Sequence, residues 1–247
     1  MPDTVARWLA ERGLEQCEET MTKTLLFDTW GTLVDNYSIA DVIEPFVFES
    51  HTAQDVAVSW RFQQKWAMFH LTLSDNFVPH PGLNEACLRW ALDRHNVKLS
   101  NEDILAINSQ YHKLRAYPDV INALKDLKAL GLVIKIVANP TKQMIADHSE
   151  FAGTLPYIDE IISSGEEARA FKPSPAVYQL GIERADCARE DILWVTRHQW
   201  EAFGAVRQNL RVAWTNRARE PKLAIGIEPT YTTRNLQELA DILANEG

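Results

Sequence analysis

The chain has 247 residues, 46% of them hydrophobic, and its formal net charge is -9. This length suits one α/β domain with an inserted subdomain. The acidic charge argues against nucleic acid or an anionic membrane as the main partner, and any site for a small anion must be locally basic. The longest apolar stretch, Leu132 to Ala138, is broken by Lys135 and is too short to span a bilayer. We therefore expect a soluble cytoplasmic protein.

The N-terminal half divides into three predicted parts. Residues 1–22 look like an N-terminal extension. Thr24 to Phe27 form a short apolar run that ends at Asp28 and is followed by Gly31, which predicts a buried parallel strand opening into a loop. Residues 37–116 carry helical periodicities, many aromatic residues and no convincing strand. We expect them to form an inserted helical cap.

The C-terminal half alternates predicted strands and helices. A helix over Val120 to Leu130 ends at Gly131, and Asn139-Pro140 is expected to start another helix, with Asn139 as the N-cap. The predicted strands of this half are 132–138, 158–162, 192–195 and 211–215. This alternation predicts a doubly wound parallel sheet, built from residues 23–36 and 117–247.

Ligands of such sheets bind beyond the carboxyl ends of the strands. That rule places Asp28, Asn139 and the segment Thr196 to His198 around one crevice, and Lys172 is in a position to join them from a loop. The cysteines Cys17, Cys87 and Cys187 lie far apart and form no metal-binding spacing, so we expect neither a zinc site nor a disulfide framework.

Four segments in order resemble the motifs of the haloacid dehalogenase superfamily, and in particular its L-2-haloacid dehalogenases. Residues 28–35 (Asp-Thr-Trp-Gly-Thr-Leu-Val-Asp) are similar to the first motif, which holds a nucleophilic aspartate. Residues 118–139 resemble the approach to the second motif, Lys172-Pro173 the third, and residues 194–204 the fourth. Four motifs on a consistent strand and helix pattern are a specific signal. The resemblance implies a modified Rossmann-like core with an inserted helical cap.

Two positions depart from the phosphatases of this superfamily. Those enzymes place a second aspartate, a proton donor, two residues after the nucleophile, where this chain has Trp30. They also hold Mg²⁺ with an acidic residue where the best-aligned position here is Arg197, whose positive charge would repel a cation. Both departures point to dehalogenation without a metal.

The resemblance assigns roles to the residues nearest the reacting atoms. Asp28 would be the nucleophile, Lys172 would keep it ionised, and Thr32 would donate a hydrogen bond to it. Arg61 falls where the dehalogenases carry the cap arginine, and a guanidinium suits either the departing halide or the substrate carboxylate. The structural alternatives are a loop-capping aspartate, a solvated lysine, a turn hydroxyl and a surface arginine.

A second group of residues is expected to bind the substrate. Asn139 would donate its amide to the halide or the substrate, whereas Ala138 stands where the family usually has a serine and removes one donor. Thr196 matches a family serine, but residues 196–199 also read as a helix capping box. The remaining candidates of this group are Thr29, Trp30, Tyr178 and Trp200. The alternative for Tyr178 and Trp200 is a packed position in the core.

His198 and Glu201 depart from the asparagine and aspartate that position the hydrolytic water in the family. A histidine near its ordinary pKa could itself take a proton from that water, and Glu201 could orient the imidazole from the same helical turn. The alternative is that His198 only fills the space of the asparagine.

These observations favour hydrolytic dehalogenation of short-chain 2-haloacids through an ester on Asp28, with release of halide. The resemblance implies no cofactor, no metal and a homodimer, and it implies preference for the L enantiomer. Two alternatives stay open: an Mg²⁺-dependent phosphatase of a small phosphate ester, and a non-catalytic binding protein of the same fold.

Overall fold

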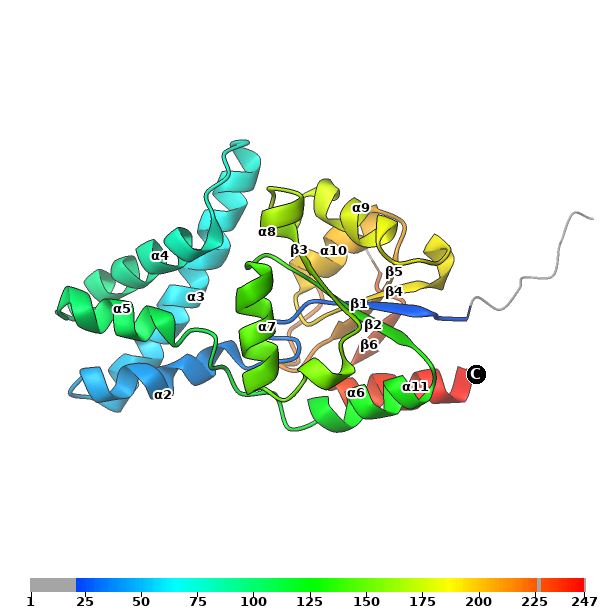
Figure 1. The fold of residues 1–247 in the computed structure, drawn as a ribbon, viewed down its shortest axis with the longest axis horizontal. Helices are drawn as coiled ribbons and strands as arrows, with labels where there is room; N and C mark the ends of the chain where they lie inside the picture. Colours follow the sequence, from blue (N-terminus) through cyan, green and yellow to red (C-terminus); the bar gives the residue numbers. More distant parts are fainter. Residues whose placement is uncertain (1–20, 226–227, 247) are drawn as a thin grey trace, which may run out of the picture.

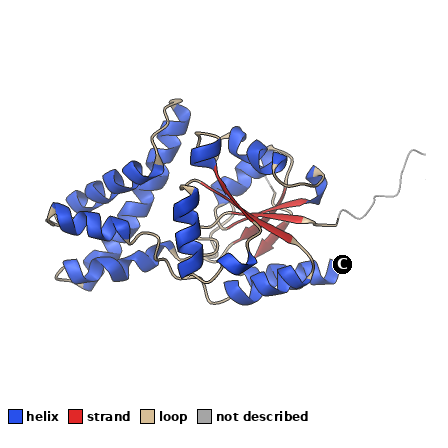
Figure 2. Ribbon diagram, viewed as in Figure 1, coloured by secondary structure: helices blue, strands red, loops and turns tan. Residues whose placement is uncertain are grey.

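The computed structural model describes residues 21–225 and 228–246, so most of the predicted N-terminal extension lies outside it. Within these residues, one parallel sheet of six strands has the order β3-β2-β1-β4-β5-β6. In chain order the strands are β1 (Thr24–Phe27), β2 (Val133–Ala138), β3 (Glu160–Ser163), β4 (Ile192–Thr196), β5 (Arg211–Thr215) and β6 (Tyr231–Thr233). The predicted α/β class with a parallel sheet is confirmed (Figure 2).

Helices cover both faces of the sheet because side chains alternate along each strand. On β1, Leu25 and Phe27 belong to one buried cluster, together with residues of α6 and α11, whereas Leu26 belongs to a second cluster with residues of α9 and α10. The helices of this half are α6 (Val120–Ala129), α7 (Lys142–Phe151), α8 (Ser164–Glu167), α9 (Pro175–Glu183), α10 (Gln199–Arg207) and α11 (Leu236–Glu246), with short turns η3 (Leu155–Tyr157) and η4 (Arg189–Asp191).

The chain between β1 and α6 is helical, and Figure 1 shows its helices grouped at one end of the molecule, beside the sheet. They are η1 (Asn36–Ile39), α2 (Ala40–Ile43), η2 (Glu44–Phe46), α3 (Ser50–Leu73), α4 (His80–Arg94) and α5 (Asn101–Ser109). Trp60 of α3 is fully buried among them and donates its indole N–H to the Asn84 carbonyl oxygen of α4 at 2.9 Å. None of the described helices is long and apolar enough to cross a membrane.

The five predicted strands are all present: β1 and β5 have the predicted bounds, and the ends of the other three differ by one or two residues. No sequence pattern predicted β6, which has only three residues and pairs with β5 alone at the edge of the sheet. Two predicted helix starts were wrong. Helix α7 is capped by Thr141, whose hydroxyl accepts a hydrogen bond from the Met144 N–H, rather than by Asn139. Helix α10 begins at Gln199, so Thr196 does not form the predicted capping box.

The loop after β1 packs closely against the loop after β4. Gly31 has a positive φ of 90°, and a Cβ atom there would lie 2.9 Å from Cδ of Arg197. Glycine is therefore required both by the backbone conformation and by the close approach of the Arg197 side chain. This turn keeps Asp28, Trp30 and Thr32 next to the loop that follows β4.

Candidate active site

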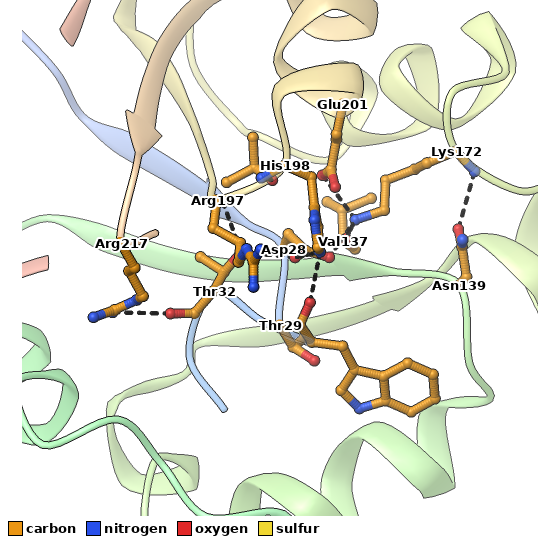
Figure 3. Close-up of polar contacts among 12 residues, drawn as sticks. Asp28, Thr29, Thr32, Val137, Asn139, Lys172, Arg197, His198, Glu201 and Arg217 are labelled. Carbon is orange, nitrogen blue, oxygen red and sulfur yellow. Dashed lines mark hydrogen bonds and ion pairs between the residues drawn. The ribbon is translucent and has the colours of Figure 1, made fainter. Parts of the chain in front are cut away.

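Asp28 lies at the carboxyl end of β1, in the middle of the sheet. Its backbone N–H donates to the Val195 carbonyl oxygen of β4 at 3.0 Å, which fixes the start of the loop. Its carboxylate accepts two short hydrogen bonds: Oδ1 from Lys172 Nζ at 2.7 Å and Oδ2 from Thr32 Oγ1 at 2.7 Å (Figure 3). The side chain is almost buried, with 6% of the residue exposed. Asp28 is thus held in one orientation at the end of the strand.

Lys172 binds three acceptors from three different parts of the fold. Besides Asp28, its ammonium donates to Glu201 Oε1 at 2.8 Å and to the Val137 carbonyl oxygen of β2 at 3.0 Å. An ammonium has three hydrogens, so each one has a partner. The residue is 2% exposed. Lys172 therefore joins β1, β2 and α10 at one buried point.

The charges of this cluster act on the pKa of each member. Burial alone would raise the pKa of Asp28, but the Lys172 charge, His198 and the hydrogen bonds from Lys172 and Thr32 bring it below its ordinary value. Burial alone would lower the pKa of Lys172, and the two carboxylates raise it instead. At neutral pH we therefore expect an ionised Asp28 carboxylate beside a charged ammonium.

Glu201 shares the ammonium but lies in a drier environment. It is fully buried, and its Oε1 accepts from Lys172 and from the Trp194 indole N–H at 2.9 Å. Its Oε2 is buried and accepts no hydrogen bond from the described residues. Burial, followed by the nearby charge of Asp28, raises the pKa of Glu201 to about 7. Glu201 is thus able to exchange a proton near neutral pH.

The predicted pairing of Glu201 with His198 was wrong. The His198 ring instead lies 5.4 Å from the Trp200 ring, nearly parallel to it, and its Nε2 lies 2.8 Å from the Trp30 carbonyl oxygen and 3.8 Å from Asp28 Oδ2. Burial, partly opposed by Asp28 and reinforced by Arg61 and Arg197, lowers the pKa of His198 to about 3.

This geometry decides which tautomer His198 adopts. A carbonyl oxygen only accepts hydrogen bonds, so the Nε2 atom must carry the hydrogen. The neutral ring then has its lone pair on Nδ1. The nitrogen that faces Asp28 therefore cannot take a proton from a water molecule there, which argues against His198 as the base.

A small cavity of about 20 Å³ opens beside Asp28, and we call it the inner cavity. Three of its side chains carry buried nitrogen atoms that have no partner in the described chain: Arg61 Nη1, Trp30 Nε1 and Trp200 Nε1. All three are N–H donors on residues that line the inner cavity, and such donors suit an anion. Its lining consists of Asp28, Thr29, Trp30, Arg61, Met68, Ala138, Asn139, Pro140, Lys172, His198 and Trp200.

The residues after β1 and β2 hold the walls of the inner cavity. Asn139 Oδ1 accepts from the Ser164 hydroxyl and from the Lys172 backbone N–H, both at 3.0 Å, and its amide Nδ2 meets only the weak acceptor Met68 Sδ at 3.2 Å. The two hydrogen bonds to Oδ1 hold the side chain in one orientation, and Nδ2 can exchange the weak sulfur acceptor for a stronger one without turning. Thr29 Oγ1 lies 2.9 Å from Nε2 of His148.

Two predicted substrate-binding residues lie away from the inner cavity. Tyr178 is buried in the cluster on the other face of the sheet, where its hydroxyl donates to the Glu201 carbonyl oxygen at 3.1 Å. Thr196 is fully buried, and its hydroxyl accepts from the His198 backbone N–H at 3.0 Å. Both residues support the chain around Glu201 and His198 rather than line the cavity.

Two supporting residues, Met68 and Arg217, were not predicted from the sequence. Met68 lines the inner cavity, and because it stands seven residues after Arg61 on α3, helical periodicity could have indicated it. Arg217 donates to the Thr32 carbonyl oxygen at 3.0 Å and to Asp119 at 2.6 Å. No pattern in the sequence indicated the contacts of Arg217, because they join residues that are far apart in the chain.

The predicted absence of a metal stays a prediction. In the described ranges, no three or more His, Cys, Asp or Glu side chains are grouped so that they could hold a metal ion. Arg197, at the position that suggested a missing metal ligand, donates to Glu220 Oε1 at 3.2 Å.

Comparisons with known proteins agree with this geometry. Residues 22–196 match the family model of the haloacid dehalogenase-like hydrolases. The chain is 30% identical over 223 residues to the (S)-2-haloacid dehalogenase of Pseudomonas fluorescens, covering 89% of this chain and 96% of that one. It is 28% identical over 219 residues to (S)-2-haloacid dehalogenase 2 of Pseudomonas sp. strain CBS-3, covering 89% and 94%. A solved L-2-haloacid dehalogenase superposes with a TM-score of 0.85 at 26% identity, over 91% of this chain and 100% of that one.

The raised pKa of Glu201 predicts a pH-dependent effect of Glu201→Gln. Between the ordinary pKa of 4.5 and about 7, the folded chain keeps a proton on Glu201 that the unfolded chain has lost, so this group's contribution to stability falls as pH rises. Glutamine does not titrate, so the stability of the variant does not fall for this reason. We expect its free energy of unfolding to gain on wild type by on the order of 1 kcal/mol or more between pH 4.5 and 7. Urea denaturation at a series of pH values measures this, and parallel curves would contradict it.

Proposed function

Because the chain belongs to the haloacid dehalogenase-like hydrolases, we propose that it hydrolyses short-chain 2-haloacids to 2-hydroxy acids, through an ester on Asp28. One observation carries the proposal. The ionised carboxylate of Asp28 lies beside an inner cavity lined by Arg61, Trp30 and Trp200, whose buried N–H donors have no partner among the described residues. A nucleophile beside donors for an anion is the arrangement that displacement of a halide requires.

In the first step, a carboxylate oxygen of Asp28 attacks C2 of the haloacid. The new C–O bond forms as the carbon–halogen bond breaks, and the halide leaves with the bonding electrons. Displacement from the opposite side inverts the carbon, so an L-2-haloacid gives a D-2-hydroxy acid. Arg61 supplies a fixed positive charge for the halide or the substrate carboxylate, and Asn139 offers either group the N–H of an amide that now meets only Met68 Sδ.

In the second step, water attacks the carboxyl carbon of the Asp28 ester. Lys172, 2.7 Å from Asp28 Oδ1, stabilises the negative charge that develops on that oxygen, and Thr32 holds the other one. The water gives a proton to Glu201, whose free Oε2 and pKa of about 7 suit a general base. As the tetrahedral intermediate collapses, the bond between the Asp28 carboxyl carbon and the ester oxygen breaks, and that oxygen takes the proton from Glu201. The hydroxy acid leaves with an oxygen that belonged to Asp28, and the new Asp28 carboxyl loses its proton to solvent because its pKa is lowered.

Phosphoryl transfer is less well supported by the same residues. A phosphatase needs an acid to protonate the departing alkoxide, and the indole of Trp30 at the corresponding position has no acidic proton to give. Halide is a weak base and needs no such proton. The residues around Asp28 therefore serve carbon–halogen displacement better than ester hydrolysis of a phosphate.

Three further expectations belong to this proposal. Residues 37–116 act as a cap, because Arg61 and Met68 of α3 contribute to the inner cavity from this segment. By analogy with the family, the protein is a homodimer located in the cytoplasm.

Halide release tests the proposed function directly. We expect the protein to release chloride from L-2-chloropropionate in the presence of excess EDTA, and Asp28→Asn to reduce the rate by at least about 10³-fold, because an amide is a poor nucleophile. Ion chromatography measures the chloride. No release by wild type, together with hydrolysis of phosphate esters on addition of Mg²⁺, would contradict the proposal.

The two residues near the hydrolytic water are predicted to behave differently when replaced. Glu201→Gln cannot take the proton, so the Asp28 ester should accumulate and be seen by mass spectrometry as an adduct on the peptide that contains Asp28. His198→Asn should leave hydrolysis of the ester within roughly fivefold of wild type, because its Nε2 already donates to Trp30. Accumulation of the ester in His198→Asn but not in Glu201→Gln would reverse this assignment.

A further inference from the structure

A second and larger cavity adjoins the inner one. It has a volume of about 240 Å³, and we call it the outer cavity. Arg61, His198 and Trp200 line both cavities, so these three side chains form the wall between them. The rest of its lining is Asn36, Tyr37, Val58, Phe62, Lys65, Arg197, Gln199 and Glu220.

One face of α3 supplies a side of the outer cavity. Val58, Arg61, Phe62 and Lys65 stand at helical spacing and therefore lie on the same face. Arg197 comes from the loop after β4, which is far from α3 in the sequence. Two different parts of the fold thus bring their cations to one space.

The outer cavity is basic although the chain carries a net charge of -9. Its charged lining consists of Arg61, Lys65 and Arg197 against the single carboxylate of Glu220. Glu220 pairs with Arg197 at 3.2 Å, and within the described part of the chain neither Arg61 nor Lys65 forms an ion pair. Burial, followed by the like charges of Arg61 and Arg197, lowers the pKa of Lys65. An anion placed here would relieve this repulsion.

The two cavities differ in what they can hold. The inner cavity, at about 20 Å³, has room for little more than one water molecule. The outer cavity, at about 240 Å³, has room for a small organic acid, with Val58 and Phe62 beside its cations. In this conformation a haloacid therefore fits in the outer cavity but not in the inner one, and passage to Asp28 requires the shared side chains to move.

We propose that the outer cavity is a binding site for a small carboxylate, and that Lys65 and Arg61 capture the 2-haloacid there before it passes into the inner cavity. The identity of the acid rests on the proposed function, whereas the carboxylate site does not. Lys65 is then a binding residue that acts before the chemical step.

Reversal of the charge at Lys65 tests the kinetic role. We expect Lys65→Glu to lower kcat/KM for L-2-chloropropionate by roughly tenfold at low ionic strength, Lys65→Met by less, and both to leave kcat within about twofold. The difference from wild type should shrink as salt is added. Lys125→Glu on the exposed surface of α6 is the matched control, because it makes the same change in net charge away from both cavities.

Titration with propionate, which has no halogen to lose, tests binding without turnover. We expect calorimetry to show roughly tenfold weaker binding to Lys65→Glu than to wild type or Lys125→Glu. Equal affinity in all three proteins, or equal kcat/KM in the two charge-reversed variants, would overturn the proposal. Weaker propionate binding to Lys65→Glu in a protein that releases no halide would support the carboxylate site and contradict the proposed function instead.

Discussion

The buried ammonium of Lys172 is the constraint on which the active site depends. Two carboxylates in a nearly dry interior would repel each other, and each would cost several kcal/mol to bury alone. Lys172 lies between them, 2.7 Å from Asp28 and 2.8 Å from Glu201, and its last hydrogen goes to the Val137 carbonyl oxygen. Its partners are Asp28 after β1, Val137 in β2 and Glu201 in the first turn of α10. The arrangement of the sheet and of α10 therefore fixes the distances in the active site.

The two carboxylates that share the Lys172 ammonium have pKa values shifted in opposite directions. Asp28 also accepts from Thr32, and its pKa is lowered, whereas Glu201 has one oxygen with no partner in the described residues and a pKa raised to about 7. Environments that push two pKa values apart are how one site provides both an ionised nucleophile and a base. The proposed two-step reaction uses the carboxylates in that order.

The sequence was informative where one physical rule decides the outcome. Apolar runs predicted five strands, and because parallel strands end at one edge, Asp28, Asn139 and His198 were expected around one crevice, which all three line. Thr196, expected with them, is buried away from it. Prediction from the sequence failed where the local backbone conformation sets the position of a side chain. His198 and Glu201 were expected to share a helical turn, but His198 is the extended residue before α10, with ψ of 115°, so helical spacing does not apply to it. Tyr178 packs on the other face of the sheet, a placement that motif order does not reveal.

The most direct test of the ester on Asp28 is a single turnover in water enriched in ¹⁸O, with enzyme in excess over L-2-chloropropionate. If the ester forms, the hydroxy acid of this first turnover carries unlabelled oxygen and one ¹⁸O atom enters the peptide that contains Asp28, because water attacks the carboxyl carbon of the ester. A labelled hydroxy acid and an unlabelled Asp28 after that turnover would mean that water attacks the substrate directly and that no ester forms on Asp28.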